Sequence, residues 1–188
     1  MLFPGGVLPL HVFEERYRQL VREGRDFGVV LIRRGSEVGP GRGEDIHPVG
    51  TLAALQEVQA LPDGRYYVLA RGVSRFRVVG LDRSRPYLMG KVESLPEPRP
   101  EAGPRLLHLL DRYLDAHGFQ IAPQVSAELG KRAVWMVGSV LQAEPGKRQR
   151  LLESADPDLA EALLASELAK LGSLGRLGAV PRRPLSPN

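Results

Sequence analysis

Four prolines within residues 94–104 (SLPEPRPEAGP) are the strongest constraint on how this chain can fold. Proline lacks a backbone N–H and has a fixed φ, which excludes this stretch from a helix interior and from a central strand. Strand-like runs separated by turn residues precede it, and helical patterns follow it. The sequence therefore predicts a β-rich subdomain over residues 1–95, a linker over 96–103 and a helical subdomain over 104–171.

One helix is predicted near the start of the β-rich subdomain. Phe13, Tyr17, Leu20 and Val21 recur at the spacing i, i+4, i+7 and i+8, which places them on one face of a helix. Gly24 is a suitable residue just past its end. We expect Phe13 and Tyr17 to anchor this helix on the neighbouring strands, because buried apolar side chains contribute roughly 1.5–3 kcal/mol each.

At least five short strands are predicted around this helix. They follow the extended start of the chain and cover the runs 27–32, 49–61, 65–72, 74–82 and 86–95, with a Gly-rich loop over 33–48. Gly50, Gly72 and the pair Asp63-Gly64 are expected to form turns, and Phe76 is expected in the core. Short strands with frequent turn signals and one helix are typical of a small closed or nearly closed β-barrel.

The helical subdomain carries good helix signals. Pro104 suits the first turn of a helix over 105–118, and a broad apolar face covers 125–145. A short helix begins at Pro145, and Asp156-Pro157 starts a last helix. Four such helices form a compact bundle, which gives an α+β fold overall. Residues 172–188 have little core-forming content and are predicted to be a flexible tail.

Composition excludes several kinds of chemistry. The chain has no cysteine, which rules out disulfides, thiolate nucleophiles and cysteine-bound metal sites. No apolar run approaches the length of a membrane span, and the N-terminus lacks the pattern of a signal peptide, so we expect a cytoplasmic protein. Many prolines with almost no asparagine fit a heat-adapted source, although a GC-rich genome gives the same bias. The net charge of +4 divides evenly between the two halves, and neither half is a dedicated polyanion-binding arm.

No motif for catalysis, cofactor binding or metal binding is present. The sequence contains no phosphate-binding loop, no nucleophile elbow and no H-E-x-x-H pattern. His11 with Glu14, or His47 with two nearby acids, could ligate a metal in principle, but such spacing is also typical of structural histidines. We therefore predict no catalytic residue, no metal ligand and no cofactor.

The residues are compatible with two kinds of binding surface. Apolar and sulfur-containing side chains suit loose capture of apolar polypeptide segments, and the candidates are Phe13, Tyr17, Tyr87 and Met89. Arginines interleaved with aromatic residues on a sheet suit single-stranded RNA, and the candidates are Arg75, Arg77 and Tyr66. In the second reading Arg75 and Arg77 lie on one wet face of their strand, opposite Phe76.

Several strings resemble the N-terminal substrate-binding domain of the ATP-dependent protease Lon, and more narrowly the short bacterial proteins made of that domain alone. They are PGG-x-LPLH-x-FE, VGT, DGR, G-x-x-RF and KRQ-LLE, in that order from about Leu2 to Leu171. The resemblance implies a PUA-like β-barrel followed by a helical bundle. It also implies recognition of unfolded or damaged proteins without catalysis, since the ATPase and Ser–Lys protease domains of Lon are separate.

The resemblance also indicates partners. Unfolded polypeptides and a full-length Lon protease are the expected ones, with apolar segments held in a groove where the two subdomains meet. The family usually begins with a further β-segment that is missing before Leu2-Phe3 here. Either the start of the chain is set too late or the first strand is shortened. A shortened first strand would expose a sheet edge, which favours pairing with a second copy.

Overall fold

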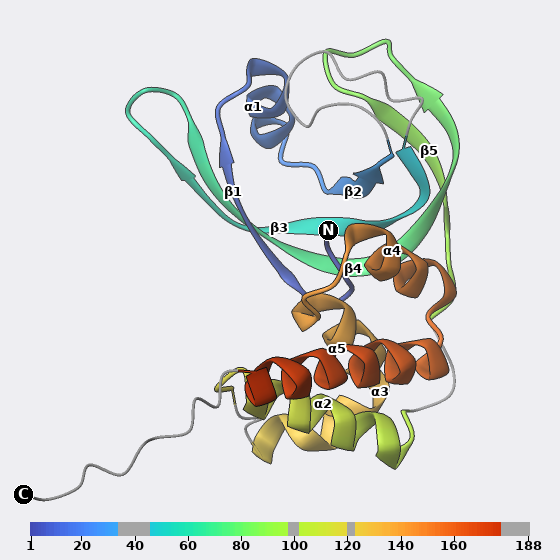
Figure 1. Cartoon of the computed structure of the whole chain (residues 1–188). Helices are drawn as coiled ribbons and strands as arrows, with labels where there is room; N and C mark the ends of the chain where they lie inside the picture. The colour runs from blue at the N-terminus through green and yellow to red at the C-terminus, as the bar shows by residue number, and fades with distance from the viewer. Residues whose placement is uncertain (34–45, 98–101, 120–122, 178–188) are drawn as a thin grey trace, which may run out of the picture.

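The computed structural model describes residues 1–33, 46–97, 102–119 and 123–177. Figure 1 shows a curved antiparallel sheet with one helix in its hollow, and a layer of helices below it. In chain order the elements are β1 (Val7–Val12), α1 (Glu15–Arg22), β2 (Phe27–Ile32), β3 (Ile46–Ala60), β4 (Tyr66–Asp82), β5 (Met89–Ser94), α2 (Pro104–Ala116), α3 (Pro123–Val140), α4 (Pro145–Ser154) and α5 (Pro157–Leu177). The predicted α+β class is confirmed.

Of the closed or nearly closed barrel expected from the sequence, the described residues show a curved five-stranded antiparallel sheet, and closure is not seen among them. Its strand order is β1-β4-β3-β2, and β5 pairs with β4. β1 pairs with residues 66–71 of β4 and β5 with residues 76–82, so the two share one edge of the same long strand. Within the described ranges no pairing joins β2 back to β1 or β5. β1 is therefore an edge strand, and Pro9 interrupts the row of N–H donors that a second copy would need for pairing.

Gly72 lies within a single continuous strand, β4, and not at the hairpin turn expected there. Its N–H donates to the Gly6 carbonyl at 2.9 Å, and its carbonyl accepts from the Gly5 N–H at 2.8 Å. A Cβ at this position would overlap the carbonyl of Phe3. Gly50 is likewise inside β3, where a Cβ would lie 2.6 Å from the Val29 carbonyl oxygen. Both glycines permit close backbone approach, a role that turn signals in a sequence do not distinguish.

The turn at Gly64 is confirmed. Gly64 has a φ of +79°, and its N–H donates to the Leu61 carbonyl at 2.9 Å. Asp63 accepts from the backbone N–H of Arg65 at 3.1 Å. This turn joins β3 to β4 at the tip of the hairpin that projects to the left in Figure 1.

Helix α1 begins two residues after Phe13, and the expectation that Phe13 anchors it is wrong. Phe13 directly follows β1 and is 52% exposed, while Tyr17 is 38% exposed. Val21 instead packs against the core of the sheet. That core consists of Leu2, Val12, Ala53, Val68 and Ala70.

The helical layer has its own, larger core. Its buried residues come from all four helices and include Leu106, Leu110, Tyr113, Val134, Val137, Leu151, Leu152, Ala160 and Leu164. Figure 1 shows α4 between the sheet and the other three helices. α5 continues to Leu177, past Gly172 where the sequence pattern placed the start of the tail, and residues 178–188 lie outside the described ones. No helix in the described part of the chain is long and apolar enough to cross a membrane.

Candidate functional site

The junction between the sheet and the helices, where a binding groove was expected, is filled with side chains. Phe3 is 1% exposed and its ring centre lies 6.4 Å from that of Trp135. Gly138 of α3 leaves the space that the Phe3 ring occupies. Gln149 of α4 donates to the carbonyl of Val49 at 3.0 Å. This junction holds the sheet and the helical layer together and does not present a free surface at these residues.

Arg75 is part of this junction, and its expected place on a wet strand face is wrong. Only 5% of it is exposed. Its Nη1 donates to the carbonyls of Leu152 (3.0 Å) and Glu153 (3.2 Å), and its Nη2 donates to the Pro96 carbonyl at 2.6 Å. Burial lowers the pKa of Arg75, partly offset by the carboxylate of Glu97. The carbonyls at the end of α4 suit a cation, because the C-terminus of a helix carries partial negative charge.

The other two residues of the RNA alternative do not share a surface with each other. Arg77 is exposed near the β5 half of β4, opposite Glu93. Tyr66 is half-buried at the start of β4 and packs against the core of the sheet. They lie eleven positions apart in β4, a path of roughly 35 Å measured along the strand. With Arg75 buried as well, the RNA reading has no assembled site.

Tyr87, one of the expected peptide contacts, is buried. It is 4% exposed, and its hydroxyl donates to Glu23 Oε2 at 2.7 Å. Arg85 donates to the Glu23 carboxylate as well, at 3.1 Å from Oε1. The hydrogen bond from Tyr87 lowers the pKa of Glu23. Tyr87 therefore ties the end of α1 to the segment before β5, while Met89 opens β5 half-buried.

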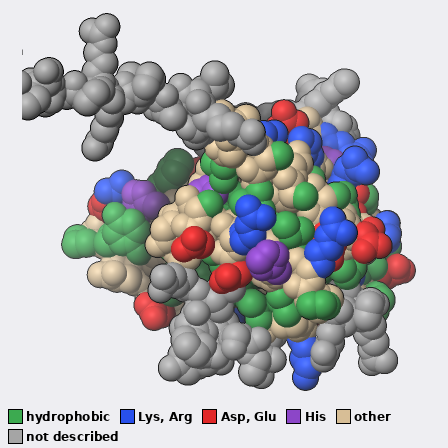
Figure 2. Space-filling view, turned by 60° about the horizontal axis from the view of Figure 1, so that its bottom comes forward, with side chains coloured by type: hydrophobic (Ala, Val, Ile, Leu, Met, Phe, Trp, Pro, Cys, Tyr) green, Lys and Arg blue, Asp and Glu red, His purple; other side chains and the backbone are tan. Residues whose placement is uncertain are grey.

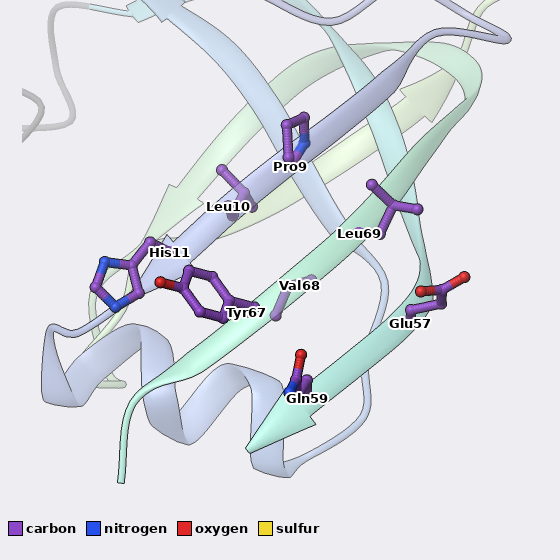
Figure 3. A pocket seen from close by; sticks show the side chains of 8 residues that line it. All are labelled: Pro9, Leu10, His11, Glu57, Gln59, Tyr67, Val68 and Leu69. Carbon is purple, nitrogen blue, oxygen red and sulfur yellow. The ribbon is translucent and has the colours of Figure 1, made fainter. Parts of the chain in front are cut away.

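A hollow lies on the outer side of β1, β4 and β3, and we call it the outer pocket. It has a volume of about 410 Å³ and is lined by Pro9, Leu10, His11, Glu57, Gln59, Tyr67, Val68 and Leu69. Figure 3 shows how it is formed by three adjacent strands. Pairing places Pro9 opposite Leu69 and His11 opposite Tyr67, and Glu57 and Gln59 follow on the other side of β4. Because alternate side chains of a strand lie on the same face of the sheet, these residues of β1, β4 and β3 form one continuous surface.

Three aromatic side chains form an exposed row beside this hollow. The ring of His11 lies 4.9 Å from Tyr67 and 6.2 Å from Phe13, measured between ring centres. Tyr67 and Phe13 are each 52% exposed. We call Phe13, His11 and Tyr67 the aromatic row. The sequence candidates included Phe13 but missed the other two, which alternate-residue spacing on β1 and β4 would have indicated.

Charge distinguishes the outer pocket from the helical face. Among the described residues, Glu57 is the only acidic side chain that lines the pocket, no lysine or arginine lines it, and Glu57 forms no ion pair. Figure 2 shows that the face formed by the helices carries both signs of charge interspersed with hydrophobic side chains. In the described ranges no group of three or more His, Asp or Glu is placed to hold a metal ion.

The fold is an α+β fold with an exposed aromatic surface on its sheet. The chain belongs to the family of LON substrate-binding domains, since the family model described as "ATP-dependent protease La (LON) substrate-binding domain" matches residues 1–168. The resemblance found in the sequence is thereby confirmed.

Relatives and solved structures agree with this assignment. The chain is 28% identical over 184 residues to a Lon protease of Koribacter versatilis, covering 90% of this chain and 23% of that protein. It is 35% identical over 101 residues to Lon protease 2 of Myxococcus xanthus, covering 52% and 12%. The chain thus spans less than a quarter of either relative. The crystal structure of a Lon N-terminal domain protein from Xanthomonas campestris matches with a TM-score of 0.64 and 29% identity, over 88% of this chain and 92% of that one.

Proposed function

We propose that this protein binds exposed apolar segments of other polypeptides at the outer pocket and the aromatic row, and that it does so without chemical change to them. The observation that carries the proposal is the exposed ring contact of His11 and Tyr67, whose ring centres are 4.9 Å apart on a sheet surface that the fold leaves open. Membership of a substrate-binding family supports a role in recognition.

The physical argument for this site begins with the exposure of two aromatic side chains to water. Tyr67 and Phe13 belong to neither hydrophobic core, and both are half in water. Aromatic rings supply large contact area with little loss of conformational entropy on binding. A contiguous exposed apolar surface bordered by polar residues marks an interaction site. Its shallow shape favours weak and broad binding over tight selection.

We further propose that the bound polypeptides are unfolded or damaged proteins, that a Lon protease is a partner, and that the cytoplasm is the site of action. Unfolded chains expose the apolar residues that folded proteins bury, so they offer many segments of the required kind. The names of the relatives support the link to Lon. A chain without cysteine suits a reducing compartment.

Binding of one protein in two states tests the proposal. A fluorescently labelled polypeptide that is permanently unfolded by reduction and alkylation is titrated with this protein, and its folded, disulfide-intact form serves as control. We expect a dissociation constant in the micromolar range or weaker for the unfolded form and no saturable binding to the folded form. Equal binding to both forms, or none to either, contradicts the proposal.

A further inference from the structure

Glu57 brings a negative charge to the lining of the outer pocket. It is exposed in β3, pairs with Leu69 of β4, and lines the pocket together with that leucine. Figure 3 shows Glu57 and Leu69 on one side of the pocket, and Tyr67 beside His11 on the other. Among the described residues Glu57 forms no ion pair and no side-chain hydrogen bond. Its carboxylate is therefore available to a cation on a bound molecule.

Apolar and aromatic groups lie next to this carboxylate. Pro9 of β1 pairs with Leu69 from the side opposite Glu57. Tyr67 is two residues from Leu69 in β4, so both side chains lie on one face of the sheet. Lysine and arginine combine an apolar stem with a charged head, and the face of an aromatic ring attracts that head. A basic side chain can thus lay its stem on Leu69 or Tyr67 while its head reaches Glu57.

Two arginines flank this stretch of β4, and they limit where a bound cation can lie. Arg65, just before β4, forms an ion pair with Asp63. Arg71 is exposed two residues beyond Leu69 and opposite Val7; it does not line the pocket, and in the described part of the chain it forms no ion pair. Because Arg71 repels a cation from its end of the strand, the favoured position is on the Tyr67 side of the carboxylate.

We propose that the outer pocket selects, among apolar polypeptide segments, those that carry a lysine or arginine next to their apolar residues, and that Glu57 sets this preference. The inference rests on the proposed function, because it concerns the class of segment that binds at the same surface. In an extended segment, side chains two positions apart lie on one face. One apolar residue therefore contacts Tyr67 while a base two positions away reaches Glu57.

Three labelled peptides that differ at one position test this preference. Each has blocked ends, leucines at alternate positions separated by serines, and one leucine replaced by lysine, glutamine or glutamate. Binding is measured by fluorescence anisotropy. An exposed ion pair changes affinity by about twofold to fivefold, so we expect the lysine peptide to bind about threefold more tightly than the glutamine peptide and the glutamate peptide to bind most weakly. Equal affinity for the lysine and glutamate peptides overturns the inference.

Charge reversal locates the preference at Glu57. Glu57→Lys should reverse the order, so that the glutamate peptide binds most tightly. Glu93→Lys is the matched control, because Glu93 is an exposed acid opposite Arg77, eight positions from Leu69 along β4. That path of roughly 26 Å is several times the screening length of about 8 Å at physiological ionic strength, so this variant should keep the wild-type order. Equal effects of the two reversals contradict the inference, and thermal unfolding of each variant confirms that it is folded.

Ionic strength provides a check that a purely structural role of Glu57 would not pass. In about 1 M salt the screening length falls to about 3 Å, so the difference between the lysine and glutamate peptides should disappear. Binding of the glutamine peptide should persist, because burial of apolar surface is not screened. A lysine preference that is unchanged in high salt contradicts an ion pair with Glu57.

The glutamine peptide separates this inference from the proposed function. If all three peptides bind equally and Tyr67→Ala weakens them all, the proposed function stands and the charge preference fails. If the lysine peptide binds and the glutamine peptide does not, broad binding of apolar segments fails and the charge preference stands. Sedimentation of the free protein gives a third outcome, because self-association that Tyr67→Ala abolishes would place a second copy on this surface and overturn the inference.

Discussion

The guanidinium carbon of Arg75 lies 5.0 Å from the centre of the Trp135 ring, so β4 and α3 meet at a cation over an aromatic face. Trp135 in turn donates from Nε1 to Glu97 at 2.9 Å. Together with the three carbonyls that accept from Arg75, this contact joins the sheet, the linker and the helices at one side chain. The position of the outer pocket relative to the helical layer depends on this junction.

Arg75→Met should lower the free energy of unfolding by about 2–3 kcal/mol. The methionine fills similar space but leaves the carbonyls of Leu152 and Pro96 without their donor, and a buried polar group without a partner costs about 1–3 kcal/mol. Arg77→Met, on an exposed residue of the same strand, should change it by less than about 0.5 kcal/mol. Urea denaturation measures both. Equal stability of the two variants would show that Arg75 does not hold the junction.

Gly72→Ala should destabilise the fold by about 2 kcal/mol or more. The added methyl group overlaps the backbone of Phe3, which is buried and cannot yield without moving the start of the chain. Gly80→Ala is the matched control in β4, because its Cβ would meet no heavy atom closer than 3.7 Å. Thermal unfolding should therefore shift strongly for the first variant and little for the second. A tolerated Gly72→Ala would refute the close approach described above.

Two glycines of α3 should respond to alanine in opposite directions. At Gly138 a Cβ would overlap the buried ring of Phe3, so Gly138→Ala should cost about 2 kcal/mol. At Gly130 no heavy atom lies within 4 Å of the new Cβ, so Gly130→Ala should stabilise the helix by up to about 1 kcal/mol. The denaturant midpoint of each variant shows whether the alanine stabilises or destabilises the fold. If Gly138→Ala leaves the midpoint unchanged, Phe3 is not what Gly138 accommodates, and if Gly130→Ala lowers it, the space around Gly130 is not open.

The order of elements could be predicted from the sequence because it depends on local patterns. The proline-rich segment, the helix caps and the alternation of Phe76 with its neighbours are all local signals, and Phe76 is indeed buried. Closure of the sheet was not predictable in this way, since it depends on which distant strands pair. Gly72 shows the same limit, because a glycine that admits the Phe3 backbone and a glycine in a turn look alike in a sequence.

The candidate site was predicted less well than the fold. Arg75 alternates with Phe76 along the strand, which is the pattern of an exposed residue. It is buried because the end of α4, about 80 positions later in the sequence, covers it and provides carbonyl acceptors for its guanidinium. Tyr87 is buried for a similar reason, because Glu23 is distant in sequence and close in space. Phe13 is the one expected contact that lies in the aromatic row, and Tyr67 joins it only through the pairing of β1 with β4.

Tyr87→Phe should make stability less dependent on pH in the acidic range. The Tyr87 hydroxyl lowers the pKa of Glu23 in the folded protein. The stabilisation from this hydrogen bond is therefore fully present above the pKa that Glu23 has in the unfolded chain, and it is lost as pH falls through the pKa that Glu23 has in the folded protein. The variant should therefore be less stable at neutral pH. The difference from wild type should shrink well below the ordinary glutamate pKa of about 4.3. Urea denaturation at both pH values checks this, and a constant difference would contradict it.

The most direct test of the central claim is the affinity for an unfolded polypeptide after loss of the aromatic row. Tyr67→Ser combined with Phe13→Ser removes two exposed rings, while Leu88→Ser removes a 41% exposed apolar residue elsewhere on the surface. We expect the double variant to bind the labelled unfolded polypeptide at least tenfold more weakly than wild type does, and Leu88→Ser to bind it as wild type does. Unchanged affinity of a folded double variant would contradict the assignment of this surface as the binding site.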